Sequence, residues 1–105
     1  MSTKQATIDF LLDQLADVPG VSARKMFGEF AVYSQGRVVA LVCDDQLYIK
    51  PTQAGRAHIG SPTEAPPYPG AKPYFLIDEQ LDDADWLSQL VNKTAAELPL
   101  PKKKK

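Results

Sequence analysis

Apolar residues near the N-terminus recur every three or four positions, as they do along one face of a helix. They are Ile8, Leu11, Leu12 and Leu15. The spacing of Ser2 and Gln5 predicts a capping box at the start of this helix, with Thr3 as the alternative cap. Pro19-Gly20 predicts the end of the helix, because proline disfavours helical geometry in the residue before it.

The centre of the chain changes to the alternating and apolar patterns of short β-strands. We expect four strands, over residues 21–27, 30–34, 37–43 and 46–50. Gly28 predicts a bend between the first two strands, Gln35-Gly36 predicts a hairpin turn, and Asp44-Asp45 predicts a third turn. The four strands therefore form an antiparallel meander.

The expected strand 37–43 is apolar on both of its faces. Strict alternation places Val39 and Leu41 on one face, and it places Val38, Ala40 and Val42 on the other. Such a pattern is typical of a strand that is covered on both sides. One layer of helices covers only one side, and a partner subunit is a candidate cover for the second. Homodimerisation is therefore a separate prediction.

The second half of the chain is rich in proline. Thr52 or Gln53 predicts the start of a short helix that runs through Ile59, and Gly60 predicts its end. The segment 60–73 contains five prolines, which fix φ and lack a backbone donor, so we expect a loop there rather than an element. Residues 74–78 then predict a fifth strand.

The last segment has the pattern of a second amphipathic helix, with Asp82 or Asp83 as its cap. Its apolar stripe consists of Ala84, Leu87, Leu90, Val91 and Leu98. The element order predicts a two-layer α+β domain with a largely antiparallel sheet of about five strands. We assign residues 1–98 to this single domain and residues 99–105 to a disordered tail of prolines and lysines.

The charge of the chain is unevenly distributed. Four of its 12 cations are Lys102–Lys105, which leaves eight cations against 13 acids in the rest of the chain. An acidic body argues against direct nucleic-acid binding, which needs a basic face. The lone Cys43 fits a reducing compartment. The apolar run 38–43 is too short to cross a membrane, and the N-terminus lacks an apolar leader, so we expect a cytoplasmic protein without membrane association.

The chain offers little chemistry of the catalytic kind. One histidine, His58, and one cysteine, Cys43, are the only pair that could act as base and nucleophile, and Cys43 ends an apolar strand where a buried structural role is usual. One Cys and one His do not make a zinc site, and no glycine-rich phosphate loop is present. We therefore expect no enzymatic activity, no metal and no cofactor.

The segment 50–74 combines basic and aromatic residues and has a single acid, Glu64. Its candidate binding residues are Lys50, Arg56, His58, Tyr68, Lys72 and Tyr74. Such a patch on an acidic protein could receive an anionic ligand or an acidic partner, or it could be a loop that carries solvated charges. The strand tyrosines Tyr33, Tyr48 and Tyr74 favour core packing or a dimer contact over base stacking.

The stretch 24–52, RKMFGEFAVYSQGRVVALVCDDQLYIKPT, resembles the N-terminal domain of the TfoX family of bacterial competence regulators. The matching pattern begins with a basic residue and Met26-Phe27-Gly28. It continues through Tyr33, Gly36, Ala40-Leu41 and the run 45–50, DQLYIK. The later stretch 65–77, APPYPGAKPYFLI, is similar to short, stand-alone members. Glu29 and Ala31 stand where many members have glycines, which also points to the short subgroup.

The resemblance covers roughly residues 17–98 and implies a two-layer α+β fold without enzymatic activity. It implies a regulatory or protein-interaction module, with a role as an accessory factor in gene regulation and a protein partner. The alternatives are a small anionic-ligand-binding protein and a weak nucleic-acid binder that uses the lysine tail. Within the motif, Met26, Phe27, Gly28 and Gly36 are expected to be structural. Arg24 and Lys25 are left as candidates for contacting a partner.

Overall fold

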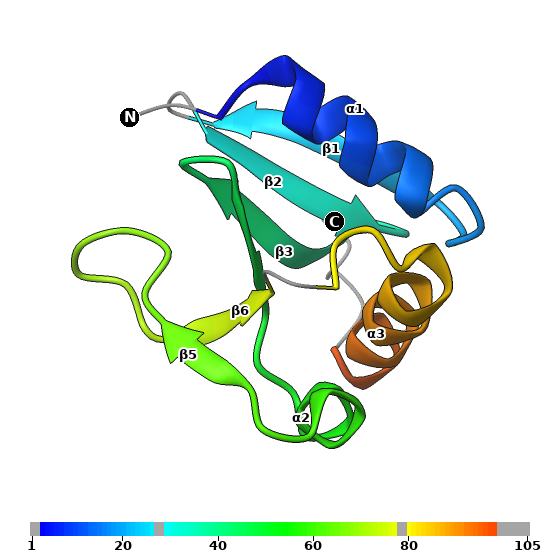
Figure 1. Ribbon diagram of the computed structural model, residues 1–105, viewed down its shortest axis with the longest axis vertical. Helices are drawn as coiled ribbons and strands as arrows, with labels where there is room; N and C mark the ends of the chain where they lie inside the picture. The colour runs from blue at the N-terminus through cyan, green and yellow to red at the C-terminus, as the bar shows by residue number, and fades with distance from the viewer. Residues whose placement is uncertain (1–2, 27–28, 78–79, 99–105) are drawn as a thin grey trace, which may run out of the picture.

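Three helices and a six-stranded sheet make up the computed structural model, which describes residues 3–26, 29–77 and 80–98 (Figure 1). The helices are α1 (Gln5–Gln14), α2 (Gln53–Ile59) and α3 (Ala84–Glu97). The strands are β1 (Val21–Met26), β2 (Glu29–Ser34), β3 (Arg37–Cys43), β4 (Gln46–Ile49), β5 (Thr63–Ala65) and β6 (Tyr74–Ile77). All neighbouring strands are antiparallel, in the order β1-β2-β3-β4-β6-β5. The predicted α+β class and the meander β1–β4 are confirmed.

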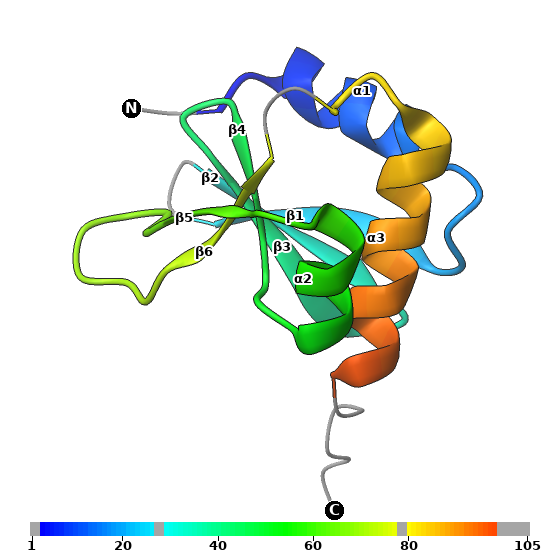
Figure 2. The same cartoon turned by 60° about the horizontal axis from the view of Figure 1, so that its bottom comes forward.

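The helices lie together on one side of the sheet, as Figures 1 and 2 show. The apolar stripes of α1 and α3 meet inward-facing strand residues in one buried cluster. Its fully buried members include Ile8, Leu11, Leu15, Leu47, Ile49, Phe75, Leu87 and Leu90. The helical and strand periodicities read from the sequence therefore converge on one core.

A β-bulge in β3 corrects the prediction of which residues share a face. Val32 pairs with Ala40 but Tyr33 pairs with Val38, so Val39 is an extra residue in the ladder. Val39 and Ala40 are both fully buried in the core, whereas Val38 is half-buried on the face of Tyr33. Strict alternation from the sequence was wrong here, because an inserted residue shifts the register by one and reverses the faces.

The proline-rich segment contains a strand, which corrects the prediction of an uninterrupted loop. Thr63, Glu64 and Ala65 form β5 and pair with β6 along its outer edge. These residues lie between Pro62 and Pro66 and keep their own backbone donors. A short edge strand tolerates prolines at its ends, since only its inner side must complete a ladder.

The start of α1 differs from the expected capping box. The N-cap is Lys4, whose side chain makes no cap hydrogen bond, and Ser2 lies outside the described residues. Thr3 instead donates its hydroxyl to the Glu29 carboxylate (2.6 Å) and to the Val42 carbonyl (3.1 Å). The threonine therefore ties the N-terminus to the sheet, and that tertiary contact competes with its use as a cap.

The helix α1 ends at Gln14, before the end that Pro19-Gly20 predicted, whereas the predicted caps of α2 and α3 are confirmed. Thr52 accepts a hydrogen bond from the Gly55 amide at the start of α2, and Gly60 ends that helix with φ of 95°. Asp83 accepts from the Trp86 amide at the start of α3. Both predicted hairpin turns have two central residues with positive φ, which is the conformation of a tight β-hairpin turn.

Candidate functional site

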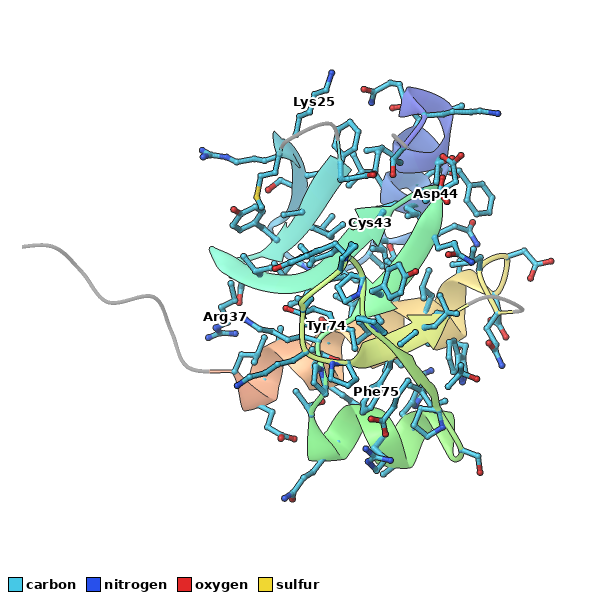
Figure 3. All side chains as sticks on the ribbon, turned by 90° about the vertical axis from the view of Figure 1, so that its left-hand side faces the viewer. Lys25, Arg37, Cys43, Asp44, Tyr74 and Phe75 are labelled. Carbon is cyan, nitrogen blue, oxygen red and sulfur yellow. The ribbon has the colours of Figure 1, made fainter. Side chains whose placement is uncertain are left out.

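The face of the sheet that the helices leave free, here called the open face, is the candidate site. Cross-strand pairing places one row of residues on it: Arg24, Ala31, Leu41, Tyr48 and Leu76. The neighbouring row, which contains Val42 and Leu47, points into the core. Figure 3 views the molecule from the side of the open face, with Cys43 and Tyr74 near its centre.

A pocket of about 390 Å³ lies on the open face. Its lining residues are Met26, Glu29, Phe30, Leu41, Cys43, Pro67 and Tyr68. They come from β1, β2, β3 and the connection between β5 and β6, which lies in front of the sheet in Figure 3. That connection supplies Pro67, which is buried, and Tyr68, which is 55% exposed. The second face of β3 is therefore partly covered by the chain itself, and a dimer stays a prediction.

Glu29 is the charged residue among those that line the pocket. Its Oε1 accepts hydrogen bonds from the Thr3 hydroxyl (2.6 Å) and from the Asp44 amide (3.1 Å). Both donors are neutral, and within residues 3–26, 29–77 and 80–98 the carboxylate makes no ion pair. The pocket therefore combines apolar residues with one negative group, the Glu29 carboxylate, whose Oε1 is fixed by two hydrogen bonds.

Cys43 lines the same pocket but has the properties of a structural thiol. Burial raises the pKa of its thiol, and the negative charge of Glu29 raises it further. Such a thiol is poorly nucleophilic at neutral pH. His58 lies on α2, with Nε2 3.1 Å from the Trp86 carbonyl and Nδ1 3.3 Å from the Lys93 ammonium. Neither ring nitrogen bonds to Cys43, so His58 does not serve as a base for this cysteine.

The basic and aromatic residues of the segment 50–74 lie on different elements of the structure. On α2, Arg56 forms an ion pair with Glu64 (2.7 Å) and lies over the Phe75 ring at 5.1 Å, while the His58 ring packs against Trp86 at 5.0 Å. Glu64 thus pairs with Arg56, which is one of the cations of the expected patch.

The remaining members of that segment are not part of α2. Tyr68 lines the pocket, and the half-buried Tyr74 belongs to the open-face register of β6. Burial raises the pKa of Tyr74. Lys72 is exposed in the β5–β6 connection, and Lys50 is half-buried after β4. The two tyrosines of the predicted patch therefore belong to the open face.

The motif around Arg24 is placed only in part. Arg24 and Lys25 are exposed on β1, the edge strand, and they lie on opposite faces as alternation predicts. Met26 lines the pocket and is 42% exposed, so this expected structural residue belongs to the candidate site. Phe27 and Gly28, with the expected tail 99–105, lie outside the described residues.

Four pocket residues were missed by reasoning from the sequence as members of a site: Glu29, Phe30, Leu41 and Pro67. The local sequence does not mark them as site residues, because each is of a type that also occurs in strands or loops without a binding role. In the part of the chain that is described, no group of three or more Cys, His, Asp or Glu is suited to a metal ion. No described helix is long and apolar enough to span a membrane.

Comparison with known proteins identifies the family. Residues 13–98 match the TfoX N-terminal domain. A similar curated protein is the "Uncharacterized 12.7 kDa protein in trpE 5'region" of Spirochaeta aurantia, which is 39% identical over 105 residues, 100% of this chain and 91% of that protein. The chain therefore belongs to the TfoX N-terminal domain family, as the motif pattern predicted.

Proposed function

We propose that the chain is a non-enzymatic protein-interaction module that acts as an accessory factor in gene regulation. The observation that carries this proposal is the open face, where an apolar pocket is bordered by Met26 and Tyr68. These are two of the three large apolar side chains that are more than a third exposed in the described structure, the third being Phe10. Exposed apolar groups gathered at a pocket are typical of an interaction site.

The partner in this proposal presents an apolar anchor side chain with acidic neighbours. The anchor enters the pocket between Leu41 and Tyr68, and the acidic groups meet Arg24, which lies on the same face of the adjacent edge strand. Charge complementarity of this kind sets orientation and association rate more than affinity. The Cys43 thiol and His58 take no part, which agrees with binding rather than catalysis.

A crosslinking pull-down from the native bacterial host tests the proposal with three forms of the full chain. The wild type and Phe10→Ser should recover the same partner, whereas the double variant Met26→Ser/Tyr68→Ser should lose it. Phe10 is the matched control, since it is as exposed as Met26 (42% for both) but lies on α1. Recovery of no specific protein, or equal recovery by all three forms, would refute the proposal.

The anionic-ligand alternative has less support from the geometry. Arg56 is paired with Glu64 and His58 is engaged by Trp86 and Lys93, so two expected anion-binding groups are occupied. The pocket itself carries a carboxylate. Direct nucleic-acid binding through the lysine tail is tested by a gel shift at low salt, where electrostatic binding is strongest.

A further inference from the structure

We propose that the pocket on the open face binds a small molecule with a cyclic apolar body and a protonated amine. This goes beyond the interaction module, and a protein partner whose anchor enters the same pocket would compete with the ligand. The apolar body fits between the sheet and the β5–β6 connection, and the amine pairs with the Glu29 carboxylate.

The size and lining of the pocket are the first step of the argument. A volume of about 390 Å³ falls in the range of small-molecule sites, which are mostly apolar and hold a few placed polar groups. Here the apolar residues of the lining are Met26, Phe30, Leu41, Pro67 and Tyr68. Together they favour a compact aromatic or alicyclic ligand.

The charge of the pocket is the second step. Thr3 and Asp44 donate to Oε1 of Glu29, while Oε2 receives no hydrogen bond from any residue that the structure describes. A carboxylate beside apolar walls is stabilised by a cation or by further donors. Because Glu29 is half-buried and has no cationic partner among the described residues, a ligand amine would form a favourable ion pair with it.

The same reasoning argues against a negatively charged ligand. Arg24 is the one cation in the open-face row of β1, but it does not line the pocket. A ligand carboxylate would therefore meet Glu29 without compensation, and like charges at short range are unfavourable. A neutral ligand of the same shape should bind with an affinity between those of the amine and the carboxylate.

A matched set of probes tests the proposal: benzylamine, benzyl alcohol and benzoate, titrated onto the purified full chain by isothermal calorimetry at neutral pH. We expect benzylamine to bind in the millimolar range and about tenfold more tightly than benzyl alcohol, since hydrogen bonds to charged groups are stronger than neutral ones. Benzoate should bind most weakly. Equal affinities, a preference for benzoate, or no binding at about 10 mM would overturn the proposal.

Variants separate the role of charge from that of shape. Glu29→Gln keeps an oxygen for Thr3 and Asp44 but removes the charge, so benzylamine should fall to the affinity of benzyl alcohol. Leu41→Phe fills the pocket and should abolish binding of both. Leu76→Phe is the control, because Leu76 is half-buried in the same row yet does not line the pocket, and it should bind as the wild type does.

Cys43 provides a second readout that locates the ligand. It is the one cysteine of the chain and lines the pocket with 7% exposure, so slow alkylation by iodoacetamide can be followed by mass spectrometry. Bound benzylamine should slow the alkylation severalfold in the wild type and leave Leu41→Phe unchanged. Calorimetric binding without any protection of Cys43 would place the ligand elsewhere and would refute the assignment.

Discussion

The two faces of the sheet are built from the same strands but are covered in different ways. On the helix side, Val42, Leu47 and Ile49 are at most 1% exposed beneath α1 and α3. On the open face, Leu41 and Leu76 are only half-buried, and Met26 is 42% exposed. Helices bury these residues on the first face, whereas the connection between β5 and β6 lies over the second face and leaves a pocket.

This difference separates stability from binding. Substitutions on the helix side should act on the free energy of unfolding, since they disturb close-packed side chains. Substitutions of the residues that line the pocket on the open face should act on binding, because groups beside a pocket already have free space. Of the four predictions below, which run from the largest expected effect on stability to the smallest, the first and the last test this separation. The other two test the contact between α2 and α3.

Leu90→Ala should lower the free energy of unfolding by about 2–5 kcal/mol, the usual cost of a cavity in a core. Leu90 is 0% exposed on α3. Leu41→Ala, the same change on the open face, should cost less than about 1.5 kcal/mol, because it enlarges an existing pocket. Urea unfolding followed by Trp86 fluorescence measures both. Equal losses would contradict the separation of the two faces.

Gly55→Val should cost about 1–3 kcal/mol through overpacking between α2 and α3. A Cβ at Gly55 would lie 2.8 Å from the Thr52 hydroxyl and 3.3 Å from that of Thr94, so the cap of α2 must also give way. Ala57→Val on the exposed side of α2 is the control and should cost less than about 0.7 kcal/mol. Thermal unfolding compares them, and similar melting temperatures would be the contrary result.

Glu97→Gln should lose stability at neutral pH but not in acid. Hydrogen bonds from the Ala54 and Gln53 amides lower the pKa of Glu97 below its ordinary value of 4.5. A lowered folded-state pKa contributes stability above the ordinary pKa, and this contribution disappears as the pH falls through the folded value. The melting-temperature gap between wild type and variant should therefore shrink in acid. A gap that is independent of pH would argue against this role.

Tyr68→Ser should change the free energy of unfolding by less than about 0.5 kcal/mol, as exposed substitutions usually do, while weakening partner recovery. Tyr48→Ser makes the same change in a residue that is 7% exposed on the same face and should cost roughly 3 kcal/mol. Chemical denaturation distinguishes the two variants. A large loss for Tyr68→Ser would mean that the β5–β6 connection is structural rather than a binding element.

Most of the fold could be predicted because its signals are local. The helices α2 and α3 have their predicted caps at Thr52 and Asp83, and the meander follows from alternation and from two tight turns. The start of α1 could not be predicted, because Thr3 finds partners 26 and 39 residues away in Glu29 and Val42. Local propensity does not include such distant partners.

The candidate site was predicted less well than the fold. Tyr68 was predicted as a binding residue, but as a member of a basic and aromatic patch. In the structure Arg56, another member of that patch, forms an ion pair with Glu64. Met26 was assigned a structural role although it borders the pocket. The sequence did not mark Glu29 and Leu41 as site residues. A strand residue lines a pocket only because another segment of the chain packs near it in the folded protein.

The family, the order of the elements other than β5, and the apolar stripes of the two long helices follow from the sequence alone, since these depend on periodicity and on turn chemistry. The tertiary structure decided the bulge at Val39, the pairing of β5 with β6 and the placement of Pro67 and Tyr68 over the sheet. These features arise from contacts between segments that are distant along the chain. The physical reason is that register and loop placement are set by packing partners, which no local pattern contains.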